Sequence, residues 1–178
     1  MARFSFIVLT VAVVQVSSNL EKDIQPCINI LAEQDEQDCC KGIEMFDKIY
    51  SNYSDKCSDL SSKEFNCEDV TCILEQAEVI KNNIVDEEAV KELFENLAQE
   101  YPQEKVLEKM DDLCLNGKYM EYFFEEQFDD CPAMNLFTCV FVNVLIECSS
   151  WKDSPQCASI AEQGKQCKMY LGTVSKKN

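Results

Sequence analysis

The sequence predicts an all-α protein: a compact, disulfide-crosslinked bundle of about seven or eight short helices around an internal apolar cavity. Only four glycines and four prolines occur in 178 residues, which leaves few turn residues for a β-rich fold. Apolar residues recur at intervals of three and four along much of the chain, as they do in amphipathic helices. Twelve cysteines, an even number, predict a framework of disulfides.

The first residues predict a secretory signal peptide, which we place at residues 1–18. Arg3 precedes an apolar run from Phe6 to Val16, and small residues follow at the expected cleavage point. A membrane anchor is the alternative, but the run is shorter than the span of about 20 residues that a bilayer requires. The remainder, residues 19–178, has a length typical of one domain, so we expect a single secreted helical domain.

Helices are predicted in order along this domain from the spacing of apolar residues. Asp86 is a good N-cap for the helix that follows it, and Gly117 suits a left-handed turn at a helix end. Ser154 precedes Pro155 in the N-cap and first helical positions. The expected helices cover residues 20–31, 41–50, about 70–82, 87–100 and 102–113, with a short helix or turn at 119–124 and a last helix from Pro155.

The stretch from Cys131 to Cys148 predicts a buried central helix. From Leu136 to Ile146 only Thr138 and Asn143 are polar, and a helix that is apolar on all sides is buried. At about 100° per residue, Cys139 and Cys148 point to opposite sides of such a helix. Two disulfides that leave in opposite directions would hold this helix in the middle of the molecule.

Composition argues against an enzyme. The chain has no histidine, which excludes a Ser-His-Asp triad, a Cys-His pair and histidine zinc sites. Phosphate-binding glycine loops are missing from the sequence, and with 33 acidic residues any chosen carboxylate pair is best interpreted as a solvated helix face. We therefore expect no catalytic residues, no cofactor and no metal.

The charge also limits the partners. A formal net charge of −17 does not suit nucleic acid or an anionic membrane surface, and favours solubility in an extracellular fluid. Asn52, in the sequence Asn-Tyr-Ser, is an N-glycosylation sequon that predicts a surface loop. A second copy of the chain and a membrane receptor stay open as partners, and no membrane span is expected in the mature chain.

The cysteine spacings resemble those of insect odorant-binding proteins, in particular the Plus-C branch with additional cysteines. Cys139 and Cys148, with eight residues between them, resemble the fifth and sixth cysteines of the family. Cys72 and Cys114 resemble its third and fourth, separated by a long interval. The Cys39-Cys40 doublet, Cys131, and Cys157 and Cys167 after Trp151 resemble the features of the branch, whereas Ser149 stands where the branch usually has proline.

The resemblance implies an interlocked pairing, Cys67–Cys139, Cys114–Cys148 and Cys40 (or Cys39) to Cys72. It leaves the pairing of the other cysteines open. All twelve are expected in disulfides: Cys27, Cys39, Cys40, Cys57, Cys67, Cys72, Cys114, Cys131, Cys139, Cys148, Cys157 and Cys167.

The expected function is extracellular transport of small hydrophobic molecules, such as odorants or other semiochemicals in olfaction, in an internal apolar pocket. An empty cavity costs about 24 cal/mol per Å³, and the disulfides would supply the stability that tolerates it. Two alternatives are a secreted helical interaction protein without a small-molecule ligand and a saposin-like lipid-binding module. The candidate pocket residues are Ile73, Leu93, Phe94, Met110, Phe124, Phe137, Phe141 and Val144.

Overall fold

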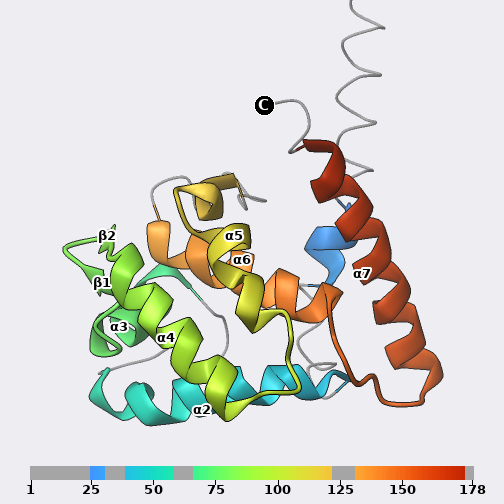
Figure 1. Cartoon of the computed structure of the whole chain (residues 1–178), viewed down its shortest axis with the longest axis horizontal. Coiled ribbons are helices and arrows are strands. Elements are labelled where there is room, and N and C mark those ends of the chain that lie inside the picture. The colour runs from blue at the N-terminus through green and yellow to red at the C-terminus, as the bar shows by residue number, and fades with distance from the viewer. Residues whose placement is uncertain (1–24, 31–38, 58–65, 122–130, 175–178) are drawn as a thin grey trace, which may run out of the picture.

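The computed structural model describes residues 25–30, 39–57, 66–121 and 131–174 of the chain (Figure 1). Within these ranges the regular secondary structure is helical apart from one short β-hairpin and one isolated β-bridge between Cys40 and Trp151, so the predicted all-α fold class is confirmed. The predicted signal peptide and Phe124 lie outside the described residues. The elements are a helix at residues 25–30, α2 (Glu44–Tyr53), α3 (Cys67–Gln76), β1 (Ile80–Lys81), β2 (Ile84–Val85), α4 (Glu87–Glu100), α5 (Met110–Cys114), α6 (Pro132–Ile146) and α7 (Pro155–Val174), with 3-10 helices at Lys41–Ile43, Ser54–Lys56, Leu107–Lys109 and Lys118–Glu121.

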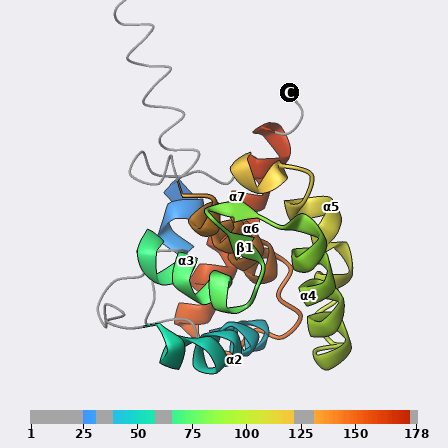
Figure 2. The same cartoon turned by 90° about the vertical axis from the view of Figure 1, so that its left-hand side faces the viewer.

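Helix α6 is the central element, as the sequence predicts. Pro132 occupies its first turn, and nearly all of its side chains are buried. Figures 1 and 2 show α3, α4 and α5 on one part of this helix and the long α7 beside its C-terminal end. Helix α6 is apolar on all sides because neighbouring elements pack around its whole circumference.

The hairpin is the main departure from the predicted elements. The expected helix at about residues 70–82 ends at Gln76, and Ile80 lies on β1 instead. Asn82 and Asn83 have φ values of 52° and 60°, the left-handed conformation that a two-residue hairpin turn requires and that asparagine tolerates. The helix expected at 102–113 is also shorter, because α5 begins only at Met110.

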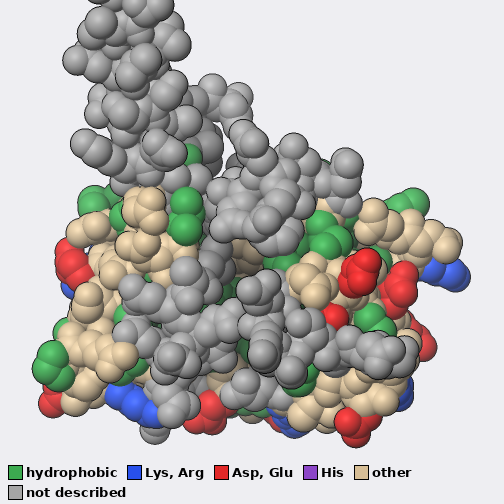
Figure 3. All heavy atoms as spheres, turned by 180° about the vertical axis from the view of Figure 1, so that it is seen from behind, with side chains coloured by type: hydrophobic (Ala, Val, Ile, Leu, Met, Phe, Trp, Pro, Cys, Tyr) green, Lys and Arg blue, Asp and Glu red, His purple; other side chains and the backbone are tan. Residues whose placement is uncertain are grey.

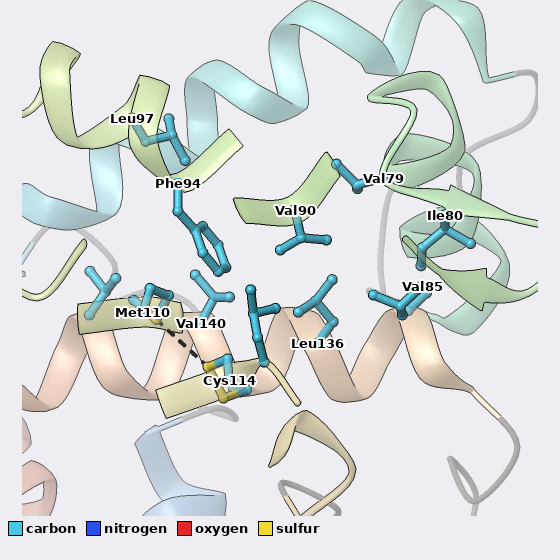
Figure 4. Packing of buried hydrophobic residues seen from close by; sticks show 14 of the residues in the cluster. Val79, Ile80, Val85, Val90, Phe94, Leu97, Met110, Cys114, Leu136 and Val140 are labelled. Atoms are coloured by element: carbon cyan, nitrogen blue, oxygen red, sulfur yellow. Dashed lines mark hydrogen bonds between the residues drawn. A yellow bond between two sulfur atoms is a disulfide. The ribbon is translucent and has the colours of Figure 1, made fainter. Parts of the chain in front are cut away.

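The buried apolar residues form two clusters on either side of α6. The larger cluster, which we call the core cluster, joins α6 to α3, the hairpin, α4 and α5. In Figure 4, Val90 and Phe94 of α4 point toward Leu136 and Val140 of α6, with Met110 and Cys114 of α5 beside them. The smaller cluster, the terminal cluster, joins α6 to the helix at 25–30, residues 39–43 and α7.

All twelve cysteines are paired in six disulfides, as expected. Six disulfides fit a protein of an oxidising, extracellular compartment. The pairs are Cys27–Cys167, Cys39–Cys157, Cys40–Cys148, Cys57–Cys72, Cys67–Cys131 and Cys114–Cys139.

The three implied pairings, Cys67–Cys139, Cys114–Cys148 and Cys40–Cys72, are wrong. Cys139 faces α5, where Cys114 is the last residue, so these two cysteines bridge. Cys131 precedes α6 and lies beside the first residue of α3, which is Cys67. Cys148 lies beyond the end of α6, so the helical angle that places it opposite Cys139 does not apply to it.

The interlocked order is nevertheless present with different cysteines. Counted from Cys57, the six successive cysteines to Cys139 pair first with third, second with fifth and fourth with sixth. The fifth and sixth positions are then Cys131 and Cys139. The error lies in which cysteines hold these positions, since the order of crossing is the one implied.

Candidate functional site

Three phenylalanine rings meet where the two apolar clusters adjoin, and we call this group the aromatic seam. Phe46 comes from α2, and Phe137 and Phe141 come from successive turns of α6. The ring centroids lie 5.6 Å apart for Phe46 and Phe137 and 5.3 Å apart for Phe46 and Phe141, both edge-to-face. Phe137 and Phe141 stack at 5.6 Å. Such pairs are favourable beyond the area that they bury.

The position of the seam follows from the helical repeat of α6. Residue 140 lies about 60° to one side of Phe137 around the helix and residue 141 about 40° to the other. Val140 belongs to the core cluster, whereas Phe141 belongs to the terminal cluster. Phe137 is thus at the boundary between the two faces of α6, and it packs against both clusters, as does Phe46.

The seam is only partly closed. Phe141 is buried, whereas Phe46 and Phe137 are half-buried. A partly exposed aromatic surface that continues into two buried clusters is suited to an apolar ligand, because the ligand can displace water from the rings without an unpaired polar group.

A buried carboxyl group lies beside the same part of α6. Glu104, in the segment between α4 and α5, is 2% exposed, and the Ser149 hydroxyl donates a hydrogen bond of 3.0 Å to its Oε1. Its Oε2 has no hydrogen-bond partner among the described residues. A Cβ added to Gly42 would lie 2.8 Å from this oxygen and 3.2 Å from Cγ1 of Val144. Glycine at position 42 therefore allows the carboxyl group to enter.

Asn143 is a polar residue of α6. From the sequence, we expect it either to orient a ligand or to bond to a neighbouring helix. Its Nδ2 donates to the carbonyl oxygen of Cys139 in its own helix at 2.8 Å. It also lies 3.8 Å from Sγ of Cys114 in α5. This contact joins Asn143 to the disulfide between α5 and α6, which favours a packing role.

The predicted pocket residues do not converge on one site. Phe94, Met110 and Val144 are buried in the core cluster, and Leu93 packs against it. Phe141 lies in the terminal cluster, and Ile73 is buried in α3 outside both clusters. Only Phe137 and Phe141 belong to the seam.

Two residues of this region are missing from the sequence-based site. Phe46 repeats with Ile43 and Ile49 at helical spacing, so the sequence places it on a packing face but gives no sign that it meets Phe137. Glu104 is one of 33 acidic residues, and its sequence neighbours do not distinguish it from an exposed carboxylate. Both became visible only from the tertiary packing.

Asn52 of the glycosylation sequon lies in the last turn of α2 and is exposed. The loop expected at this position is therefore a helix end. Within the described ranges, no three or more potential ligand residues are grouped as a metal ion requires. No helix among the described residues has the length and apolar character needed to cross a bilayer.

No family model matches the sequence, and no curated protein or solved structure matches it.

Proposed function

We propose that this protein is a secreted carrier of small hydrophobic molecules, and that the aromatic seam is where the ligand binds. The observation that supports this function best is the meeting of three phenylalanine rings, two of them half-buried, between two apolar clusters. The described side chains of both clusters are apolar, and the seam joins the two clusters. An apolar ligand is therefore favoured over a polar one.

Desolvation supplies the binding energy. Burying a few hundred Å² of ligand surface at about 25 cal/mol per Å² gives roughly micromolar affinity once association costs are subtracted. The six disulfides stabilise the fold by limiting the unfolded chain, and this stability offsets the cost of a space for the ligand. The internal cavity expected from the sequence would then form at the seam.

The resemblance to insect odorant-binding proteins gives the ligand class. The disulfides from Cys57 to Cys139 have the interlocked order that the resemblance implies, with Cys131 and Cys139, in place of Cys139 and Cys148, as the fifth and sixth cysteines. Odorants and other semiochemicals are apolar molecules of the size that a seam of three rings can contact. A second copy of the chain or a membrane receptor remains a proposed further partner, and Asn52 a proposed glycosylation site.

Displacement of a fluorescent hydrophobic probe from the purified protein tests the ligand site. Replacing Phe137 or Phe46 by alanine is expected to weaken probe binding by about fivefold, since each change removes one ring–probe contact worth roughly 1 kcal/mol beyond its area. Phe137→Leu, which keeps an apolar side chain, should lose less. Ile84→Ala is the matched control, because Ile84 is 70% exposed on the distant hairpin.

Native mass spectrometry of the same preparation separates the carrier from its alternatives. A co-purified small hydrophobic molecule supports the carrier. A ligand-free protein that takes up no hydrophobic probe supports an interaction protein instead. Binding to lipid vesicles at low pH, with no binding of soluble probe, supports a saposin-like module.

A further inference from the structure

The six disulfides divide the described chain into two crosslinked halves. The core half, residues 44–57, 66–121 and 131–146, contains Cys57–Cys72, Cys67–Cys131 and Cys114–Cys139. The terminal half, residues 25–30, 39–43 and 148–174, contains the other three. No disulfide joins one half to the other, so their contact depends on packing and on the connecting chain.

The two chain connections between the halves lie at one place. The chain enters the core half after Ile43 and leaves it after Ile146, and the Cys40–Cys148 disulfide joins these two points. We call this disulfide the clasp. A structural unit that is joined to another by two adjacent segments of backbone can rotate about that junction. Two junctions far apart would prevent the rotation.

The terminal half is held together independently of the core half. Cys27–Cys167 and Cys39–Cys157 join its N-terminal residues to α7. Cys40 and Trp151 form an antiparallel bridge, and the N–H of Lys152 donates to the carbonyl oxygen of Cys39 at 2.9 Å. This half can therefore move as one body.

Its contact with the core half is mainly apolar and lies next to the seam. Phe141, Val142 and Leu145 of α6 are buried in the terminal cluster. Figure 1 shows α7, in red, beside the end of α6, and an added Cβ at Gly164 of α7 would lie 3.9 Å from Cα of Ile146. Lys168 pairs with Glu147 at the surface, where ion pairs contribute little.

Glu104 lowers the stability of the contact between the two halves, at a point beside the clasp. The carboxyl group belongs to the core half, and both Ser149 and Gly42, which it touches, lie within two residues of the clasp. A buried carboxyl with one hydrogen bond and one unpartnered oxygen is poorly satisfied, and it regains water when the two halves separate. The closed arrangement thus contains a group that favours opening.

We propose that the terminal half is a lid that turns about the clasp, and that Glu104 sets how readily it opens. Opening exposes Phe141 and Leu145 together with the seam. The evidence for the lid is the disulfide pattern and the buried Glu104 carboxyl group. That the lid opens to admit the ligand rests on the proposed function.

Hydroxyl-radical footprinting of the full chain, read by mass spectrometry, tests the lid. Phe141 and Leu145 are 7% and 4% exposed, close to Phe94 and Leu136 at 3% each, which lie wholly within the core half. The lid predicts that the first pair is oxidised several times faster than the second. Equal, slow oxidation of all four residues overturns the proposal.

Two substitutions set the direction of the change. Glu104→Met replaces the carboxyl group by an apolar side chain of similar length that gains nothing from hydration, so oxidation of Phe141 and Leu145 should fall about tenfold. Ser149→Ala removes the one side-chain hydrogen bond that the described residues give the carboxyl group, and it should raise the oxidation of Phe141 and Leu145. Ser51 is a serine of α2 whose hydroxyl bonds within its own helix, so Ser51→Ala should leave the oxidation of Phe141 and Leu145 unchanged.

The same samples separate the lid from the carrier. If Phe141 and Leu145 are oxidised faster but no probe binds, the lid is supported and the carrier function is excluded. If the probe binds but neither Glu104→Met nor Ser149→Ala changes the oxidation of Phe141 and Leu145, the carrier is supported and the lid is overturned.

Discussion

Gly42 and Gly164 are in opposite situations, although both glycines lie close to α6. A Cβ at Gly42 would clash with the Glu104 carboxyl at 2.8 Å, whereas a Cβ at Gly164 finds its nearest neighbour at an ordinary contact distance of 3.9 Å. Gly164 also lies within α7, where glycine is less favourable than alanine because it has more backbone freedom to lose.

The pair predicts changes of opposite sign. Gly42→Ala should lower the free energy of unfolding by about 1–3 kcal/mol, the usual cost of forcing a methyl group into a packed interior. Gly164→Ala should raise it by about 0.5–1 kcal/mol. Denaturant unfolding of both variants measures this, and a destabilised Gly164→Ala would show that α6 and α7 pack more closely than described.

Tyr119 provides the pH-dependent prediction. Burial, and then the negative charge of Glu87, raise the pKa of this phenol above its usual value of 10.0. Glu87 is held in place because the N–H groups of Asn116 and Gly117 donate to its two carboxylate oxygens at 2.8 and 2.9 Å. Its charge therefore stays close to the ring.

The sign of the effect follows from the direction of the shift. The neutral phenol is favoured in the folded state, so its contribution to stability is complete below pH 10.0 and is lost as the pH rises through the higher folded pKa. Tyr119→Phe should therefore lose less stability than the wild type between about pH 9 and pH 11. Denaturant unfolding at both pH values tests this, with the exposed Tyr50→Phe as control; equal losses in all three proteins would contradict it.

At the scale of elements, the helix starts were the most predictable feature. The Asp86 side chain accepts a hydrogen bond from the N–H of Ala89 at 3.2 Å, and Ser154 accepts one from Cys157 at 3.1 Å, as N-caps do. These signals are local, since the capping residue and the N–H that it serves lie three residues apart. The end of α3 was less predictable, because Ile80 fits a helical repeat equally well. The helix ends before Glu78, which has a left-handed φ of 62°, and the turn at Asn82 and Asn83 then reverses the chain.

Asp86→Ala measures what the cap contributes. It removes an acceptor from the first turn of α4 and should cost about 1 kcal/mol of stability. Gln99→Ala, at an exposed position near the other end of the same helix, should change stability by no more than about 0.5 kcal/mol. Thermal unfolding of the two variants compares them directly, and equal shifts would mean that the Asp86 contact does not stabilise α4.

For the whole molecule, the sequence predicted the helical class, the central position of α6 and the involvement of every cysteine, but not which cysteines pair. Spacing records distance along the chain, whereas pairing depends on which helix faces meet. The turn of α6 that directs Cys139 toward Cys114 is set by the packing of α3, α4 and α5. The same packing brings Phe46 to Phe137 and buries Glu104, which is why the candidate site was only partly predictable.

The disulfide pattern makes a quantitative prediction about the terminal half. Cys27–Cys167 spans 140 residues, and a loop of that length alone would stabilise by more than about 4.7 kcal/mol in the chain-entropy description. Cys39–Cys157 already closes most of this loop. The loop that Cys27–Cys167 then adds spans only 12 residues from Cys27 to Cys39 and 10 from Cys157 to Cys167. Removing Cys27–Cys167 by double alanine substitution should therefore cost about 3 kcal/mol, close to the cost of removing Cys57–Cys72, which spans 15 residues. Denaturant unfolding of the two double variants decides this, and a much larger loss for Cys27–Cys167 would mean that Cys39–Cys157 does not close the terminal half by itself.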